Sequence, residues 1–267
     1  MKNLSKVINM LLVAVLLFSC TSTSKKDGNT EENWIQLFNG KDLNDWTVKI
    51  KGYEVGENFG NTFRVEDGLL KVRYEEYDSL RDRFGHIFYN QEFSRYKIRV
   101  EYRIHGEQCP GAPGWAYRNS GIMLHGQSPE TMEIDQDFPT SIEVQLLGSD
   151  STIDRTNLNV CTPGTNIVMN DQLILDHCTN SSSGLFYGDD WFTVEVEVHG
   201  NEVIHHIFGG DTVLTYYKPQ LDERDSTFPK LIALNGGDLM LHKGTISLQS
   251  EGHPIDFRKV ELLVIEE

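Results

Sequence analysis

The sequence is poor in basic residues, and outside its N-terminal segment it lacks long hydrophobic runs. The chain of 267 residues carries 24 Lys and Arg against 40 Asp and Glu, which gives a formal net charge of −16. Because phosphate binding depends on clustered Lys and Arg, this shortage disfavours nucleic acids and anionic membrane surfaces as partners. A hydrophobic content of 39% with 10% aromatic residues is typical of a globular protein.

Several motifs that carry well-known chemistry are also missing. There is no Gly-rich phosphate loop, no Cys/His spacing typical of zinc sites, and no Gly-x-Ser-x-Gly of the α/β-hydrolases. Glu133, Asp135 and Asp137 alternate along one segment, but they lack the EF-hand pattern, so a solvated acidic loop is favoured over a Ca²⁺ site. The sequence therefore predicts no cofactor and no metal.

Residues 1–19 have the features of a bacterial lipoprotein signal peptide. A short basic start precedes an apolar run over residues 10–18, and about nine apolar residues are too few to span a bilayer but suit a signal-peptide core. The run ends in LFSC at residues 17–20, which resembles the lipobox in which the Cys is lipidated after cleavage. The alternative is a plain secretory signal that contains a Cys.

This signal predicts how the mature chain is organised and where it lies. Residues 20–33 are a lipidated Cys20 and a flexible polar tether, and residues 34–267 form a single domain. We expect an exported protein held in the bacterial cell envelope, in the periplasm or at the outer membrane. The lipid would be its only membrane contact, and the oligomeric state is left open.

Four cysteines are present, of which Cys20 is the expected lipidation site, so three remain in an oxidising compartment. A bridge between Cys161 and Cys178 would close a loop of about 16 residues and contribute roughly 3 kcal/mol in the chain-entropy model. We therefore predict a Cys161–Cys178 disulfide with Cys109 unpaired. Cys109 is expected to be a small buried hydrophobe, with a thiolate nucleophile as the alternative.

Period-two alternation recurs along most of the chain, whereas helical patterning is scarce. Residues 97–104, 142–146 and 192–199 each place apolar side chains on one face and polar side chains on the other. About a dozen such strands, separated by Gly- and Asp-rich turns, favour an all-β fold of two packed antiparallel sheets. Loops and the polar face of one curved sheet would form a groove.

Polar residues concentrate on two neighbouring strands in the middle of the chain. Arg118, Asn119 and His125 belong to one strand, and Glu143 and Gln145 belong to the next. If both strands present these side chains to one surface, they supply a proton-transfer group, hydrogen-bond donors and a cation for developing negative charge. The alternative is a structural His beside solvated surface polar residues.

Five segments spread from residue 37 to residue 258 form an ordered set of motifs. They are LFNGKDLNDW at 37–46, FRVEDGLL at 63–70, RNSGIMLH at 118–125, IEVQLL at 142–147 and GTISLQSEGHPIDFR at 244–258. Together they resemble the 3-keto-disaccharide hydrolase family over about residues 34–265. Any one motif is weak, but five in the family's order are specific.

The resemblance implies a concanavalin A-like jelly-roll sandwich, in agreement with the alternation. It also implies a carbohydrate-active enzyme, a hydrolase or lyase that cleaves 3-keto-glycosides by elimination and rehydration. A ketone at C3 acidifies the hydrogen on C2, so that a base can remove it and the enolate can expel the C1 substituent. An ordinary glycosidase instead needs two carboxyl groups about 5–9 Å apart across the bond.

From the shared-face spacing and the family match we assign Glu143 or His125 as the base, with His253 as the other proton-transfer residue. Arg118 and Asn119 would bind the keto oxygen and stabilise the enolate. The other expected sugar contacts are Gln145, Gln249, Trp115 and Tyr117.

Two features depart from the commoner family pattern, so substrate identity is not carried over. His125 and Gly126 stand where many members carry an Arg, and residues 161–178 form an inserted module whose His177 could line the groove. A non-catalytic, lectin-like carbohydrate-binding module and a structural lipoprotein with a vestigial groove are the competing interpretations. The titratable residues favour the enzyme, because a lectin groove needs no proton-transfer pair.

Overall fold

Alternating side chains build the larger of two β-sheets. The computed structural model describes residues 33–266, so the signal peptide, Cys20 and nearly all of the predicted tether lie outside the described residues. In β6 (Arg95–Ile104) every second residue from Tyr96 to Ile104 is buried, and the residues between them are half-buried. β13 (Phe192–His199) alternates in a similar way and pairs antiparallel with β6. Their apolar rows belong to one hydrophobic core.

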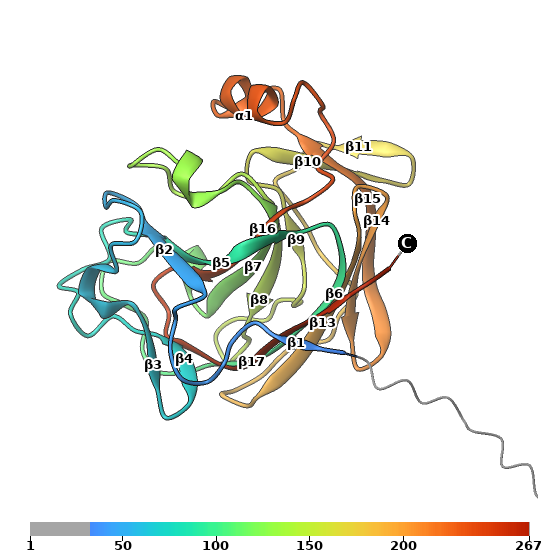
Figure 1. Cartoon of the computed structure of the whole chain (residues 1–267). Coiled ribbons are helices and arrows are strands. Elements are labelled where there is room, and N and C mark those ends of the chain that lie inside the picture. The colour runs from blue at the N-terminus through green and yellow to red at the C-terminus, as the bar shows by residue number, and fades with distance from the viewer. Residues whose placement is uncertain (1–32, 267) are drawn as a thin grey trace, which may run out of the picture. The chain divides into compact units, whose positions relative to one another are not determined.

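The strands form two antiparallel sheets, shown in Figure 1. In order across the sheet, the ten-stranded sheet contains β11 (Gln172–Ile174), β10 (Thr165–Met169), β15 (Asp211–Leu221), β14 (Val203–Phe208), β13, β6, β17 (Ile255–Val264), β4 (Leu69–Val72) and β3 (Phe63–Glu66), with β1 (Ile35–Gln36) beside β17. The seven-stranded sheet contains β12 (Cys178–Thr179), β9 (Val160–Cys161), β8 (Ile142–Leu147), β7 (Asn119–Gly126), β16 (Gly244–Ser250), β5 (Gly85–Phe93) and β2 (Trp46–Ile50).

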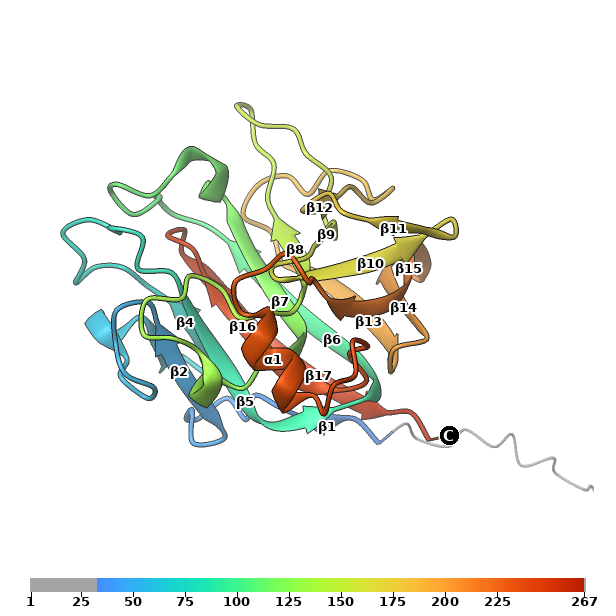
Figure 2. The same cartoon turned by 90° about the horizontal axis from the view of Figure 1, so that it is seen from above.

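Helices are few and short in the described part of the chain. They are α1 (Phe228–Leu234) and the 3₁₀ turns η1 (Phe59–Asn61), η2 (Gly114–Ala116) and η3 (Pro129–Thr131). Figure 2 shows α1 in front of the strands of the smaller sheet, and its residues share a cavity with the end of β7 and the start of β16. None of the helices within residues 33–266 is long and apolar enough to cross a membrane.

The central strands of the smaller sheet are buried on both faces. Every residue of β7 and every residue of β16 is buried. One face, with Ile122 of β7 and Leu248 of β16, joins the hydrophobic core. The other face is covered by loops. Lys49, for example, donates a hydrogen bond of 2.9 Å from its Nζ to the carbonyl oxygen of Ile134 in one of these loops. The loops thus shelter a face that is rich in polar residues.

The predicted fold class, an all-β antiparallel sandwich of two sheets, is confirmed. β6, β8 and β13 confirm the strands expected at 97–104, 142–146 and 192–199. The expected total of about a dozen is too low, since seventeen strands occur within the described residues. Two-residue strands such as β9 and β12 are too short to carry a period-two signal.

The cysteines are arranged as predicted. Cys161 and Cys178 form a disulfide that joins β9 to β12. Cys109 is free and buried, and burial raises the pKa of its thiol to about 11. A thiol with so high a pKa is poorly suited to act as a thiolate nucleophile at neutral pH, so the alternative role for Cys109 has no support.

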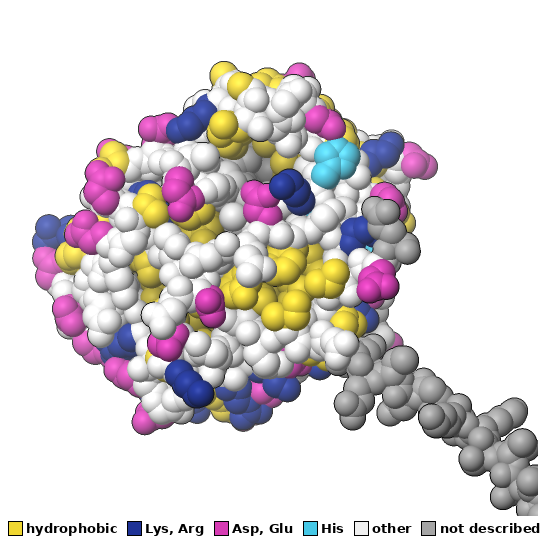
Figure 3. All heavy atoms as spheres, in the orientation of Figure 1, with side chains coloured by type: hydrophobic (Ala, Val, Ile, Leu, Met, Phe, Trp, Pro, Cys, Tyr) yellow, Lys and Arg dark blue, Asp and Glu magenta, His cyan; other side chains and the backbone are white. Residues whose placement is uncertain are grey.

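Acidic side chains are scattered over the face of the described residues seen in Figure 3, with Lys and Arg among them. Surface charges also form ion pairs elsewhere on the molecule, such as Lys97 with Glu197 at 3.1 Å on the larger sheet. On the face seen in Figure 3 the acidic side chains are spread out and do not form one patch.

Candidate functional site

A row of polar side chains crosses the loop-covered face of the seven-stranded sheet. Strand register places Lys49 of β2 beside His86 of β5, and His86 beside Gln249 of β16. Gly121 of β7 comes next and pairs with Gln145 of β8. Because side chains in one cross-strand row point the same way, the row projects away from the core.

Gly121 leaves a gap in this row, and the gap is filled by its neighbours. A Cβ placed on Gly121 would lie 2.7 Å from Oε1 of Glu143 and 3.1 Å from Oε1 of Gln249. The carboxyl group of Glu143 and the amide of Gln249 therefore converge over the glycine. A strand glycine often marks such a close approach.

A cavity of about 470 Å³ opens beside this row. Its inner lining consists of Asn119, Glu143, Gln145, Leu147, Arg155, Asn159 and Glu251. Nearer the surface it is lined by Trp115, Phe138, Pro163, His177, Asn180 and the Cys161–Cys178 disulfide. The polar groups thus come from β7, β8, the end of β16 and the loop before β9.

Glu143 and Glu251 form a pair of buried carboxyl groups in this cavity. They are only 6% and 3% exposed. Burial raises the pKa of Glu143, and burial together with repulsion from Glu143 raises the pKa of Glu251. Two buried carboxyl groups that repel each other favour a state in which the pair holds one proton. A pair that has lost one of its two protons can both accept and donate a proton.

Arg155 supplies the positive charge of the cavity. Its guanidinium donates hydrogen bonds of 3.4 Å to the carbonyl oxygen of Trp115 and 2.9 Å to that of Arg118, and it also bonds the carbonyl oxygen of Tyr117. Attraction to Arg155 opposes the rise in the pKa of Glu251. Since an arginine remains charged when partly buried, Arg155 provides a fixed cation beside the carboxyl pair.

Several polar atoms at the cavity floor have no hydrogen-bond partner among the described residues. They are Asn119 Oδ1, both amide atoms of Gln249, and Glu251 Oε2. Gln145, in contrast, accepts a hydrogen bond of 3.2 Å from Asn159. Unpaired buried polar atoms are costly and mark positions where a polar ligand would gain hydrogen bonds.

His86 is the remaining titratable residue of the row. It is 1% exposed, and both ring nitrogens lack a partner within the part of the chain that the structure describes. Burial lowers the pKa of His86 to about 3, so its imidazole is neutral. Its ring contacts Phe138 edge to face at 5.9 Å, which places it behind one wall of the cavity.

One group of residues has side chains of metal-ligand type close together. Cys161, His177 and Cys178 lie with their ligand atoms within 4.8 Å of one another. Both sulfur atoms are joined in the disulfide, so neither is free to act as a thiolate ligand. His177 alone does not make a metal site.

Five predicted site residues come together here. Glu143, Asn119, Gln145 and Trp115 line the cavity, and Gln249 lies against Glu143 at its floor. The shared position of the four residues other than Trp115 follows from the alternation of β7, β8 and β16, whereas Trp115 lies in η2. The roles assigned to them stay predictions.

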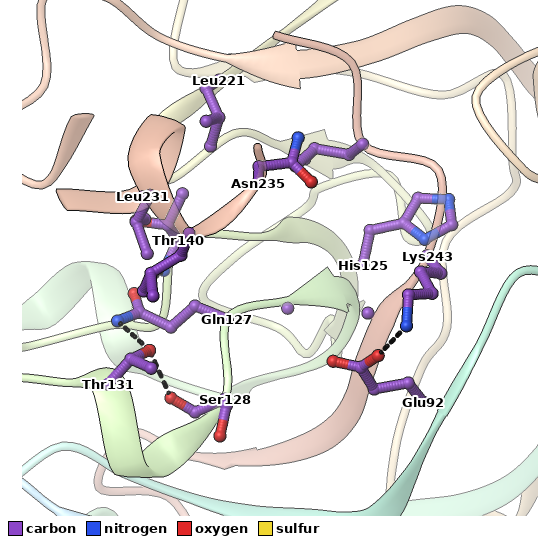
Figure 4. Close-up of a pocket in the computed structure, with 14 residues that line it drawn as sticks. Glu92, His125, Gln127, Ser128, Thr131, Thr140, Leu221, Leu231, Asn235 and Lys243 are labelled. Atoms are coloured by element: carbon purple, nitrogen blue, oxygen red, sulfur yellow. Dashed lines mark hydrogen bonds and ion pairs between the residues drawn. The ribbon is translucent and has the colours of Figure 1, made fainter. Parts of the chain in front are cut away.

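The expectation that His125 shares this surface is wrong. Its φ of 48° breaks the alternation at the end of β7, where the pairing with β16 also shifts register. The imidazole Nε2 lies 2.9 Å from the carbonyl oxygen of Gly200, and burial lowers the pKa of His125 to about 4. His125 lines a separate cavity of about 210 Å³ beneath α1, shown in Figure 4 with Lys243 and Glu92 at its edge.

Arg118, Tyr117 and His253 do not line the cavity of Glu143 either. The guanidinium of Arg118 donates 3.0 Å hydrogen bonds to Ile104 O and to Asp189 Oδ1, so it ties the two sheets and a loop together. Tyr117 donates a hydrogen bond of 2.6 Å to Asp150. His253 accepts one of 3.2 Å from the Arg118 backbone and packs edge to face on Tyr117. Arg118 has a φ of 49°, which breaks the strand geometry just before β7.

Glu251, Arg155, Asn159, Phe138 and His86 are absent from the site residues expected from sequence. Glu251 carried a usable signal, because it lies two residues after Gln249 and so continues the same face of the strand. Arg155 and Asn159 lie in the irregular segment before β9, where no periodicity indicates which way a side chain points.

Comparison with known proteins identifies relatives of this chain. Residues 33–263 match the family model described as a 3-keto-alpha-glucoside-1,2-lyase-like domain. No curated protein matches the chain.

Several solved structures resemble the fold. A candidate glycosyl hydrolase from Parabacteroides distasonis is 16% identical, with a TM-score of 0.50, over 87% of this chain and 99% of the other. A second structure described in the same way, from the same organism, is 17% identical with a TM-score of 0.49 over 87% and 94%. The β-glucanase of Bacillus licheniformis is 11% identical with a TM-score of 0.47 over 88% and 98%.

At 16% identity the structure with a TM-score of 0.50 speaks for the fold alone. The family match covers most of the chain and agrees with the five motifs, and it supports a carbohydrate-related activity. The chain therefore belongs to the family of 3-keto-alpha-glucoside-1,2-lyase-like domains.

Proposed function

We propose that this protein cleaves 3-keto-glycosides by elimination followed by rehydration. The observation that carries the proposal is the pair of buried carboxyl groups, Glu143 and Glu251, with raised pKa values in one cavity. Elimination needs one group that accepts a proton and one that donates a proton. A carboxyl pair that shares a single proton supplies both groups.

In the first step the carboxylate of Glu143 removes the hydrogen on C2 of the 3-keto sugar. The C2–H electron pair moves into the C2–C3 bond, and the C3 carbonyl becomes an enolate. Glu143 is chosen as the base because the pKa of Glu251 is raised by repulsion as well as burial, which favours Glu251 as the holder of the shared proton.

In the second step the enolate re-forms the ketone and expels the substituent on C1. The C1–O bond breaks, a C1–C2 double bond forms, and Glu251 gives its proton to the leaving oxygen. Water then adds its oxygen to C1 and a proton returns to C2, so that the overall reaction is hydrolysis.

The enolate oxygen needs positive charge and hydrogen-bond donors, because negative charge develops there in the transition state. Arg155 provides the charge and the amide of Asn119 provides a donor, and both line the same cavity. This assignment gives Arg155 the role that the sequence suggested for Arg118.

Isotope incorporation tests the chemistry. A 3-keto-disaccharide is incubated with the enzyme in D₂O, and the released sugar is analysed by mass spectrometry and NMR. Elimination and rehydration place deuterium on C2 at the rate of cleavage, whereas displacement at C1 leaves the C2 hydrogen in place. A sample without enzyme corrects for spontaneous exchange beside the ketone. Cleavage with an intact C2–H bond would overturn the proposal.

Binding without cleavage would favour the competing function. If the protein binds an unoxidised disaccharide and leaves the 3-keto sugar intact, it is a carbohydrate-binding module. The buried carboxyl pair argues against that outcome, because a site that only binds sugar has no need for two carboxyl groups of raised pKa.

Export and lipid attachment at Cys20 remain part of the proposal. The lipobox-like residues 17–20 support it. Full-length protein expressed in a bacterium with radiolabelled palmitate is expected to carry label in the membrane fraction, and a Cys20→Ala variant is expected to carry none. Label retained by the variant would contradict lipidation at this residue.

A further inference from the structure

The cavity of Glu143 is graded from a buried floor to an exposed rim. Glu143 is 6% exposed and Glu251 is 3% exposed, whereas Trp115 at the rim is 53% exposed. The floor is closed, because β7 and β8 present the opposite face to the hydrophobic core. A sugar whose C1–C2–C3 edge reaches the carboxyl pair therefore enters through the rim and has no exit on the far side.

The substituent on C1 has to occupy the rim in this arrangement. It is still attached when the sugar ring reaches the floor, and the sheet leaves no space for it there. The cavity volume of about 470 Å³ lies within the range of about 300–1,000 Å³ for small-molecule pockets. A cavity of this size accommodates one sugar ring and its substituent. It does not have the open shape of a cleft that binds the middle of a polysaccharide.

One side of the rim is an aromatic stack. Trp115 packs on Phe84 with ring centroids 5.6 Å apart, and Phe84 stacks on Phe138 at 5.2 Å with an interplanar angle of 24°. Arg155 holds the backbone of Trp115 through its carbonyl oxygen. The exposed ring thus rests on a buried neighbour, which is 5% exposed, and is positioned before any ligand arrives.

The other side of the rim is the inserted module found in the sequence. The Cys161–Cys178 disulfide, Pro163 and His177 all line the cavity there. The disulfide ties β12 to β9, and β9 pairs with β8 next to Glu143. The rim is therefore a slot between an aromatic wall and a cross-linked wall.

We propose that this slot is a leaving-group subsite and that Trp115 is the residue that sets its preference for C1 substituents that carry a ring. This inference rests on the proposed function. An aromatic ring or the apolar face of a second sugar stacks on an exposed Trp, whereas a simple alkyl group does not. Stacking on an aromatic ring is expected to raise kcat/KM by about fivefold to tenfold.

The test compares benzyl and methyl 3-keto-glucosides of one anomer, whose leaving oxygens have similar basicity. The expected kcat/KM ratio of benzyl to methyl is about fivefold to tenfold for the wild type. It falls toward one in Trp115→Ala and is largely kept in Trp115→Phe. Tyr217→Ala, which removes an exposed aromatic residue that does not line the cavity, is expected to keep the wild-type ratio. Melting temperatures confirm that each variant is folded.

The outcomes separate the two proposals. Cleavage of both substrates with a ratio near one, or a ratio unchanged in Trp115→Ala, overturns the subsite and leaves the proposed function standing. Failure to cleave either substrate overturns the proposed function. Calorimetric titration with the same two glucosides then decides the subsite, which requires tighter binding of the benzyl compound that is lost in Trp115→Ala.

Discussion

The carboxyl group of Glu143 occupies the space that a side chain on Gly121 would fill. A Cβ at Gly121 would lie 2.7 Å from Glu143 Oε1 and 2.9 Å from Glu143 Cγ. The two residues come from neighbouring strands, β7 and β8. The absence of a side chain at Gly121 thus sets the position of the proposed base.

Gly121→Ala is expected to displace the Glu143 carboxyl group with little effect on the fold. The added methyl group meets only the side chains of Glu143 and Gln249 within its nearest contacts. A shift of about 1 Å in a catalytic group costs about 100-fold in rate, so kcat/KM for a 3-keto-glucoside should fall by about that factor. Gly184→Ala is the control, because nothing lies within 4 Å of its added Cβ. Equal activity of the two variants would argue against Glu143 as the base.

Glu143→Gln should abolish most of the activity while it preserves the shape of the side chain. Removal of a general base typically costs about 10²–10⁴-fold in kcat. The measurement is the release of the C1 substituent from a 3-keto-glucoside. The exposed Glu57 serves as the matched control, since Glu57→Gln makes the same chemical change away from the cavity. Activity of Glu143→Gln near the wild-type level would exclude Glu143 as the base.

Glu251→Gln should stabilise the protein at alkaline pH. In the folded state the pKa of Glu251 is raised well above its ordinary value of 4.5. Between that value and the raised pKa the folded state binds more protons than the unfolded state, so stability falls as pH rises. The variant lacks this loss of stability. The melting temperature of the variant minus that of the wild type should therefore be larger at about pH 8 than at about pH 5.

The same difference at both pH values would show that Glu251 does not carry a raised pKa. A lower kcat in the same variant is expected separately, because Glu251 is the proposed proton donor to the leaving oxygen.

Arg155 and Arg118 should respond differently to substitution. Arg155→Lys is expected to lower kcat by at least about tenfold. A lysine cannot hold the backbone carbonyl oxygens that Arg155 bonds and at the same time present its charge to the enolate. Arg118→Met is expected to lower the free energy of unfolding by about 1–3 kcal/mol, because carbonyl groups such as Ile104 O lose their donor. Activity assays and urea denaturation measure the two effects. A large loss of kcat in a fully stable Arg118→Met would reverse the assignment.

How far the site could be predicted depended on the local geometry of each residue. Asn119, Glu143 and Gln145 lie on regular strands, and their alternation was enough to place them on one face. His125 and Arg118 flank the same strand but have positive φ values of 48° and 49°. Non-glycine residues rarely adopt such backbone angles, so strand alternation could not indicate the direction of their side chains.

The alternating pattern predicted the all-β sandwich, the cysteine spacing predicted the Cys161–Cys178 disulfide, and the ordered motifs indicated the family. Those features are local or depend on sequence spacing, which one sequence records directly. Only the tertiary structure brought Glu251 and Arg155 to Glu143, and only the tertiary structure showed which polar groups are buried together. The pKa values of the carboxyl pair follow from that burial and proximity, which arise when distant strands and loops meet.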